Sequence, residues 1–160
     1  MVTGRGSQRV CDRLIQHSGF QVAHPAMTPE ETLRFMNENP VFFLATVKDD
    51  KPYVRGMMLY QADELGIVFG STEGKDLHQQ LLMNPAVELC FYDSGTGQQV
   101  RVGGSVEYLQ DPDIAADLVM RFPFLKAGAD TEPVLYRLRH GVVTVWTPGR
   151  EPDSKAYESI

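Results

Sequence analysis

The fold class is decided by residues 41–70, which read VFFLATVKDDKPYVRGMMLYQADELGIVFG. Three runs in this stretch, at 41–47, 52–60 and 66–70, are rich in β-branched, aromatic and other apolar residues, and short polar turns separate them. Connections of this length join neighbouring antiparallel strands. The stretch therefore predicts an antiparallel meander of three strands.

Helix and strand signals continue on both sides of the meander. Thr28 and Glu31 form a capping box with Pro29 at the first helical position, so a helix is expected to begin there and to end before Pro40. The last two strands of the chain are expected to pair as a hairpin around His140. Two more helices are expected at residues 74–83 and 111–122, and four more strands at residues 86–92, 98–109, 134–138 and 142–146. Six or seven short antiparallel strands at this spacing usually close into a barrel or a sandwich.

Length and composition favour one globular domain with an extension at each end. The chain has 160 residues, of which 42% are hydrophobic and 22% charged, close to the averages for soluble globular proteins. The domain is expected at residues 28–147, with an arm or tail at 1–27 and a tail at 148–160. Three interpretations of the first segment stay open: an ordered arm, a loose tail, or an upstream extension from a misplaced start codon.

Charge, hydropathy and motif spacing argue against several classes of protein. A net charge of −6 and a pI of about 5.1 argue against nucleic-acid binding. No run approaches the ~20 apolar residues of a membrane span, and the first residues lack the apolar core of a signal peptide. Cys11 and Cys90 lie in unlike segments, which favours free thiols and a cytoplasmic location. The histidines lack metal-ligand spacing, so no metal site is expected, and no Gly-x-Ser-x-Gly elbow is present.

The segment after the third strand has the character of an anion site. Gly70, Ser71 and Thr72 lead through Gly74 into the expected helix, which places small residues, hydroxyls and backbone N–H groups at a helix N-terminus. The helix dipole favours a negative ligand there, and Lys75 adds a positive charge. The alternative is an ordinary helix cap beside a solvated lysine.

Arg55 is expected to join this site from the neighbouring strand. Counting back from the turn at 61–65 places Arg55 near Gly70 and Ser71 in the antiparallel ladder. Arg55 and Lys75 could then hold one phosphate together, the arginine in bidentate geometry. The alternative is that Arg55 is simply an exposed strand residue.

The residues that follow Arg55 suit a flat ligand. Gly56 sits inside a strand, where glycine often marks the close approach of a ligand or of another backbone. Met57 and Met58 follow it, and methionine side chains adapt to irregular surfaces. A flat aromatic ligand lying along this strand is therefore expected.

The order and spacing of four stretches resemble the pyridoxamine 5′-phosphate oxidase-like family of FMN-binding split β-barrels. The resemblance covers residues 28–147 and rests on residues 43–47, 52–57, 66–72 with Lys75, and 84–89. It implies a mainly β (α+β) fold: an antiparallel split β-barrel of six to seven strands with about three flanking helices. It also implies a homodimer with the flavin at the interface.

The resemblance assigns roles to particular residues. Arg55 and Lys75 would hold the FMN phosphate, and Gly56, Met57 and Met58 would lie against the isoalloxazine. The remaining assignments are a ribityl-phosphate channel lined by Gly70, Ser71 and Thr72, and contacts to the partner's cofactor from Gln99, Arg101 and Trp146.

The resemblance predicts an FMN-dependent oxidoreductase that acts on a small flat substrate, with no catalytic acid or base identified. Family enzymes that oxidise pyridoxamine phosphate carry a further C-terminal segment that binds their substrate, whereas this chain ends shortly after Trp146. An activity other than vitamin B6 oxidation is therefore expected. The alternatives are the same barrel with a deazaflavin or haem, and a flavin-binding module without catalysis.

Overall fold

The computed structural model describes residues 27–126 and 132–149. The N-terminal segment up to Ala26, the residues from Arg150 onward and most of the loop expected at 128–132 lie outside the described residues. The division of the chain into residues 1–27, 28–147 and 148–160 therefore stays a prediction.

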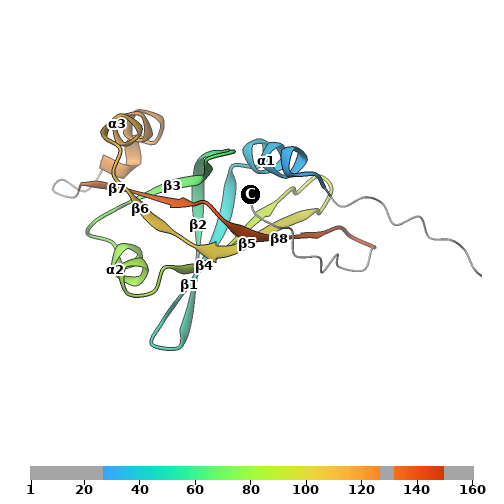
Figure 1. Ribbon diagram of the computed structural model, residues 1–160, viewed down its shortest axis with the longest axis horizontal. Coiled ribbons are helices and arrows are strands. Elements are labelled where there is room, and N and C mark those ends of the chain that lie inside the picture. Colours follow the sequence, from blue (N-terminus) through green and yellow to red (C-terminus); the bar gives the residue numbers. More distant parts are fainter. Residues whose placement is uncertain (1–26, 127–131, 150–160) are drawn as a thin grey trace, which may run out of the picture.

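The described residues form a mainly antiparallel sheet with helices around it, which confirms the predicted fold class (Figure 1). The sheet has eight strands rather than six or seven. None of the described helices is long and apolar enough to cross a bilayer. The helices are α1 (Pro29–Glu38), α2 (Asp76–Met83), α3 (Pro112–Arg121) and the short 3-10 helix η1 (Pro123–Lys126). The strands are β1 (Val41–Lys48), β2 (Lys51–Asp63), β3 (Gly66–Thr72), β4 (Ala86–Tyr92), β5 (Gln99–Ser105), β6 (Glu107–Leu109), β7 (Pro133–Leu138) and β8 (Gly141–Trp146).

The strand order is β6-β7-β3-β2-β1-β4-β5-β8, and the predicted meander β1-β2-β3 forms its centre. Two long bent segments, β5–β6 and β7–β8, pair with each other along both halves of the sheet. Gly104 pairs with Gly141 in one half, and Glu107 pairs with Arg137 in the other. Because each segment crosses from one half to the other, the sheet curls into a half-barrel.

This topology corrects two expectations. The strand predicted at 98–109 is interrupted at Val106, which is buried and donates its backbone N–H to the carbonyl of Pro85 at 3.0 Å instead of continuing the ladder. The hairpin predicted around His140 is wrong, since β7 pairs with β3 and β6 while β8 pairs with β5. The chain bends at His140 and continues in the same general direction.

The core lies inside the curled sheet, and α1 closes one side of it. The rings of Phe42, Phe69, Phe91 and Tyr136 are almost fully buried and lie in contact, with neighbouring centroids 5.0–5.6 Å apart. Helix α1 begins at the predicted capping box. A smaller apolar cluster packs α3 against the outside of β3 and β7, and it positions one wall of the site described next.

Candidate functional site

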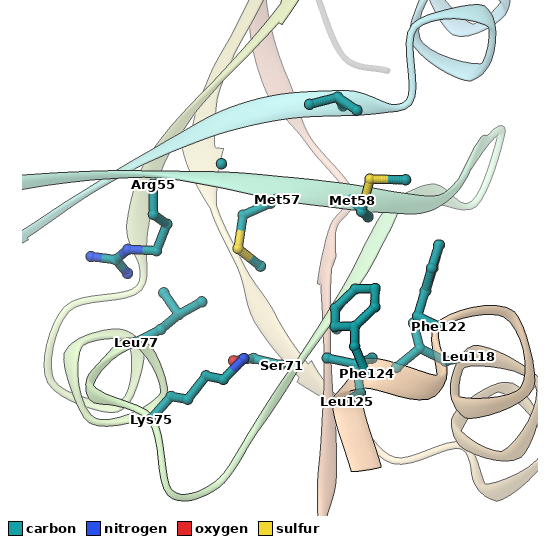
Figure 2. A pocket seen from close by; sticks show the side chains of 13 residues that line it. Arg55, Met57, Met58, Ser71, Lys75, Leu77, Leu118, Phe122, Phe124 and Leu125 are labelled. Atoms are coloured by element: carbon teal, nitrogen blue, oxygen red, sulfur yellow. The ribbon is translucent and has the colours of Figure 1, made fainter. Parts of the chain in front are cut away.

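A cavity of about 390 Å³ lies between the sheet and the helices α2 and α3 (Figure 2). Its volume falls within the roughly 300–1,000 Å³ typical of small-molecule sites. Residues from three places line it: Arg55, Gly56, Met57 and Met58 on β2; Gly70, Ser71, Lys75 and Leu77 from β3 to α2; and Leu118, Phe122, Phe124 and Leu125 on α3 and η1, with Val41 of β1 completing the lining.

The pocket brings together seven of the residues singled out from the sequence: Arg55, Gly56, Met57, Met58, Gly70, Ser71 and Lys75. Thr72 is buried at the end of β3 and is not among the lining residues. Gln99, Arg101 and Trp146 lie on β5 and β8, away from the lining residues.

Arg55 is half-buried and held by two neighbours. Its Nη2 donates hydrogen bonds to the Oε1 of Gln80 at 2.7 Å and to the Oγ1 of Thr46 at 3.1 Å. Its Nη1 is buried, and the described residues offer it no hydrogen-bond acceptor. Burial lowers the pKa of the guanidinium, and the charge of Asp76 opposes that shift. A buried donor of a charged group without an acceptor is costly, so the pocket suits an anion.

The register between β2 and β3 differs from the predicted one. A bulge between Leu59 and Gln61 shifts the pairing, and the ladder ends where Leu59 pairs with Phe69. Arg55 therefore lies beyond the end of this ladder and does not pair with the residues near Gly70; on its other side it pairs with Leu44 of β1. Arg55 still reaches the same cavity as Ser71, because its side chain projects from β2 toward α2 (Figure 2).

Helix α2 starts later than predicted and begins at the pocket. Lys75 is its N-cap residue and not a residue of its first turn, while Ser71 belongs to β3 and is buried. The cap of α2 has no side-chain hydrogen bond, whereas Thr28 caps α1 and Asp111 caps α3 in this way. The N–H group of His78 donates to the carbonyl of Lys75 at 3.0 Å, whereas those of Asp76 and Leu77 receive no side-chain acceptor from the cap and are the ones that an anion at this helix end would engage.

Sequence reasoning missed the apolar wall opposite the basic residues. Leu118, Phe122, Phe124 and Leu125 approach the cavity from α3 and η1, on the side away from Lys75 (Figure 2). The run Phe122-Pro123-Phe124-Leu125 was the available signal, since it places apolar side chains directly after a helix. The cavity is thus polar at one end and apolar at the other.

Two glycines differ in why they lack a side chain. A Cβ on Gly70 would lie 2.4 Å from the Cδ2 of Leu118, so Gly70 makes room for the packing of α3. A Cβ on Gly56 would have no heavy atom within 4 Å. The open space beside Gly56 agrees with the expectation that another molecule approaches this strand.

The family model described as pyridoxamine 5′-phosphate oxidase matches residues 28–133. The chain belongs to this family. A pyridoxine/pyridoxamine 5′-phosphate oxidase of Gluconobacter oxydans (strain 621H) is 30% identical over 91 residues, which are 57% of this chain and 46% of that protein. The chain thus spans less than half the length of the curated relatives it matches.

Solved structures of the pyridoxamine 5′-phosphate oxidase-like family share the fold. A NimC/NimA family protein from Clostridium acetobutylicum superposes with a TM-score of 0.65 at 24% identity, covering 82% of this chain and 92% of that one. HutZ, described as a haem storage protein of Vibrio cholerae, gives a TM-score of 0.55 at 15% identity, covering 84% and 96%. At these identities the likeness establishes the fold alone.

Of the four family-assigned residues that do not line the pocket, three form a separate group on β5 and β8. Gln99 pairs with Trp146 across the two strands, and the Cys90 thiol donates to the Oε1 of Gln99 at 3.8 Å. Arg101 forms an ion pair with Glu88 at 3.4 Å. Burial raises the pKa of the Cys90 thiol, while the charge of Arg101 opposes that shift. Their expected role toward a partner's cofactor stays a prediction.

Proposed function

We propose that this chain is an FMN-binding flavoprotein that exchanges electrons with a small flat substrate. The observation that carries the proposal is the guanidinium of Arg55 at the wall of a cavity that Lys75 also lines, because its buried Nη1 has no acceptor within residues 27–126 and 132–149. An FMN phosphate offers the acceptor oxygens and the negative charge that this end of the cavity lacks.

The lining divides into parts that suit the two ends of FMN. Arg55, Lys75 and the backbone N–H groups at the start of α2 would hold the phosphate. The isoalloxazine would lie against Gly56 and Met57 and reach the apolar wall of α3 and η1. When bound, FMN supplies reversible hydride and single-electron exchange.

In this proposal the residues of the chain bind the flavin, orient it and shield it from water. Among the described residues that line the cavity there is no histidine, aspartate or glutamate, and the proposal assigns no general acid or base to the wall. Leu118, Phe122 and Phe124 make one end of the cavity apolar. At the other end Arg55 would hold the phosphate of the flavin. Catalysis would then depend on the position and the surroundings of the cofactor.

A homodimer is part of the proposal. The outward face of β1 and β2 exposes apolar side chains, with Val41 54%, Phe43 50% and Val54 68% exposed. In the ladder Phe43 pairs with Gly56, so this face runs directly into the cavity. Contiguous apolar surface of this kind marks an interaction site. A second copy on this face would bring its own residues to the flavin, and Gln99, Arg101 and Trp146 are the candidates.

Haem is the second ligand to consider, because HutZ has the same fold. Among the described residues that line the wall there is no imidazole, while Met57 and Met58, whose thioethers can also bind haem iron, do line it. The Nδ1 of His78 instead lies 2.5 Å from the hydroxyl of Tyr136. The positive charges of Arg55 and Lys75 favour a ligand that carries a phosphate, so FMN remains the first candidate.

The test is the visible spectrum of the purified protein, followed by titration of the ligand-free protein with FMN, a deazaflavin and haem. Flavin bands, about one FMN per chain and reduction by NADH or NADPH support the proposal. A Soret band with no affinity for FMN would replace it with haem binding. A colourless protein that binds none of the three ligands would remove the cofactor assignment altogether.

A further inference from the structure

The buried side-chain amide of Gln80 accepts a hydrogen bond from Arg55. Gln80 of α2 is 3% exposed, and Thr46 of β1 is 1% exposed. The Oε1 of Gln80 accepts hydrogen bonds from the Oγ1 of Thr46 and from the Nη2 of Arg55, both at 2.7 Å. Thr46 in turn accepts from the same Nη2 at 3.1 Å. The three side chains thus form a closed triangle that links α2, β1 and β2.

The chemistry of the three groups fixes how the triangle is oriented. A guanidinium only donates hydrogen bonds, so the atom of Gln80 that faces Arg55 must be the amide oxygen. That oxygen and the Thr46 hydroxyl both accept from Nη2, and in the part of the chain that the structure describes Nη1 has no acceptor. The triangle therefore restrains the guanidinium through Nη2, and Nη1 stays available to donate to a ligand.

The neutrality of Gln80 matters as much as its position. A carboxylate at this place would accept the same hydrogen bonds but would neutralise the charge of Arg55. The amide holds the guanidinium and leaves its positive charge available to an anion in the cavity. Held in place beforehand, the guanidinium loses little conformational freedom when an anion binds.

We propose that Gln80, supported by Thr46, is the positioning residue that makes the cavity select a phosphate-bearing flavin over an uncharged one. This inference rests on the proposed function, because it concerns the same cavity. Gln80 is not among the residues that line the cavity, so it acts through Arg55.

The experiment compares the dissociation constants of FMN and riboflavin for the full-length protein and its variants, measured by quenching of flavin fluorescence. The wild-type protein is expected to prefer FMN. Gln80→Leu removes the acceptor, and Gln80→Glu keeps it but adds a negative charge. In both variants the preference for FMN should fall about tenfold or more, with riboflavin affinity little changed, because hydrogen bonds to a charged group are among the strong ones.

Gln79→Leu is the matched control, since Gln79 is the exposed neighbour of Gln80 on the same helix. A merely structural role for Gln80 would lower stability or weaken both ligands equally, without changing their ratio. Should Gln80→Leu fail to fold, Gln80→Glu still decides, because it preserves the buried hydrogen bonds. The inference is overturned if Gln80→Glu keeps the wild-type ratio of riboflavin to FMN dissociation constants, or if Gln79→Leu lowers that ratio as much as the Gln80 variants do. The proposal of FMN binding would still stand in either case. A wild-type protein that binds neither flavin overturns the proposed function and this inference with it.

Discussion

Gly70 and Leu118 fit together because one of them has no side chain. A Cβ on Gly70 would lie 2.4 Å from the Cδ2 and 2.9 Å from the Cδ1 of Leu118, and Leu118 is fully buried. Since Leu118 also lines the cavity, this contact couples the packing of α3 to the shape of the site.

Gly70→Ala is therefore expected to destabilise the protein by about 1–3 kcal/mol, the usual cost of forcing extra volume into a packed interior. Urea unfolding measures the change. Gly103→Ala serves as the control, because a Cβ there meets no heavy atom within 4 Å. An equal loss in the two variants would mean that the contact with Leu118 is not the cause.

Arg55→Met is expected to weaken FMN binding without lowering the stability of the ligand-free protein. The variant removes a buried charged group whose Nη1 has no acceptor among the described residues, together with the two hydrogen bonds of Nη2, while the hydrogen bond between Thr46 and Gln80 remains. The free energy of unfolding of the ligand-free protein should therefore stay constant or rise by up to about 1 kcal/mol. FMN affinity should fall strongly, because the guanidinium is lost. A ligand-free variant less stable by several kcal/mol would contradict this expectation and show that the hydrogen bonds of Nη2 outweigh the cost of burying the guanidinium.

Local signals in the sequence predicted most of the elements. The capping box at Thr28 and Glu31 begins α1, and the short polar turns of residues 41–70 produce β1, β2 and β3. Each of these features depends on residues within a few positions of one another. Such features can be read from a single sequence because the chain realises them with little help from distant contacts.

Long-range features could not be predicted in this way. Whether the strand at 98–109 continues past Val106 depends on its partners, β4 and β8 in one half of the sheet and β7 in the other. The same holds for the bend at His140. The alternation of side chains along a strand says which face they occupy, but it does not identify the neighbouring strand.

Only the part of the candidate site that depends on local sequence could be predicted. Arg55, Gly56 and Lys75 stand out by their residue type and position in the sequence. Phe122 and Phe124 reach the cavity only because α3 packs on β3 and β7, about 50 positions along the chain from Ser71. When a residue reaches a site through packing between distant segments, the neighbouring sequence does not reveal its role.

Lys75→Ala is expected to weaken FMN binding about two- to fivefold at low salt, because an exposed charge contributes modestly. The difference from the wild-type protein should shrink as salt is added, since salt screens exposed charges. Titration with FMN at two ionic strengths measures the difference, and Lys51→Ala, at the exposed first residue of β2, is the control. A loss that does not depend on salt would argue against a contact between Lys75 and the phosphate.

Val54→Asp is expected to dissociate the proposed homodimer. Val54 is 68% exposed on the outward face of β2, so the charge should not disturb the core of one chain. Light scattering coupled to gel filtration gives the mass, and FMN titration follows the loss of binding when the second copy is absent. The control is Leu65→Asp, which changes an exposed apolar residue in the turn before β3. A wild-type protein that is monomeric with FMN bound would contradict the interface.

Tyr136→Phe tests the pH dependence of stability at the alkaline end. Burial, with a smaller contribution from Tyr108, raises the pKa of the Tyr136 hydroxyl to about 12 from its ordinary value of 10. The folded state therefore favours the protonated hydroxyl, and its contribution to stability is complete below pH 10 and is lost as the pH rises toward 12.

Removing the hydroxyl should flatten this alkaline loss and cost about 0.5–1.5 kcal/mol at neutral pH, because the hydrogen bond to His78 disappears. Urea unfolding at a series of pH values gives the curve, and Tyr53→Phe, at an exposed position on β2, is the comparison. If the alkaline slope of Tyr136→Phe equals that of the wild-type protein, another group must cause the loss of stability.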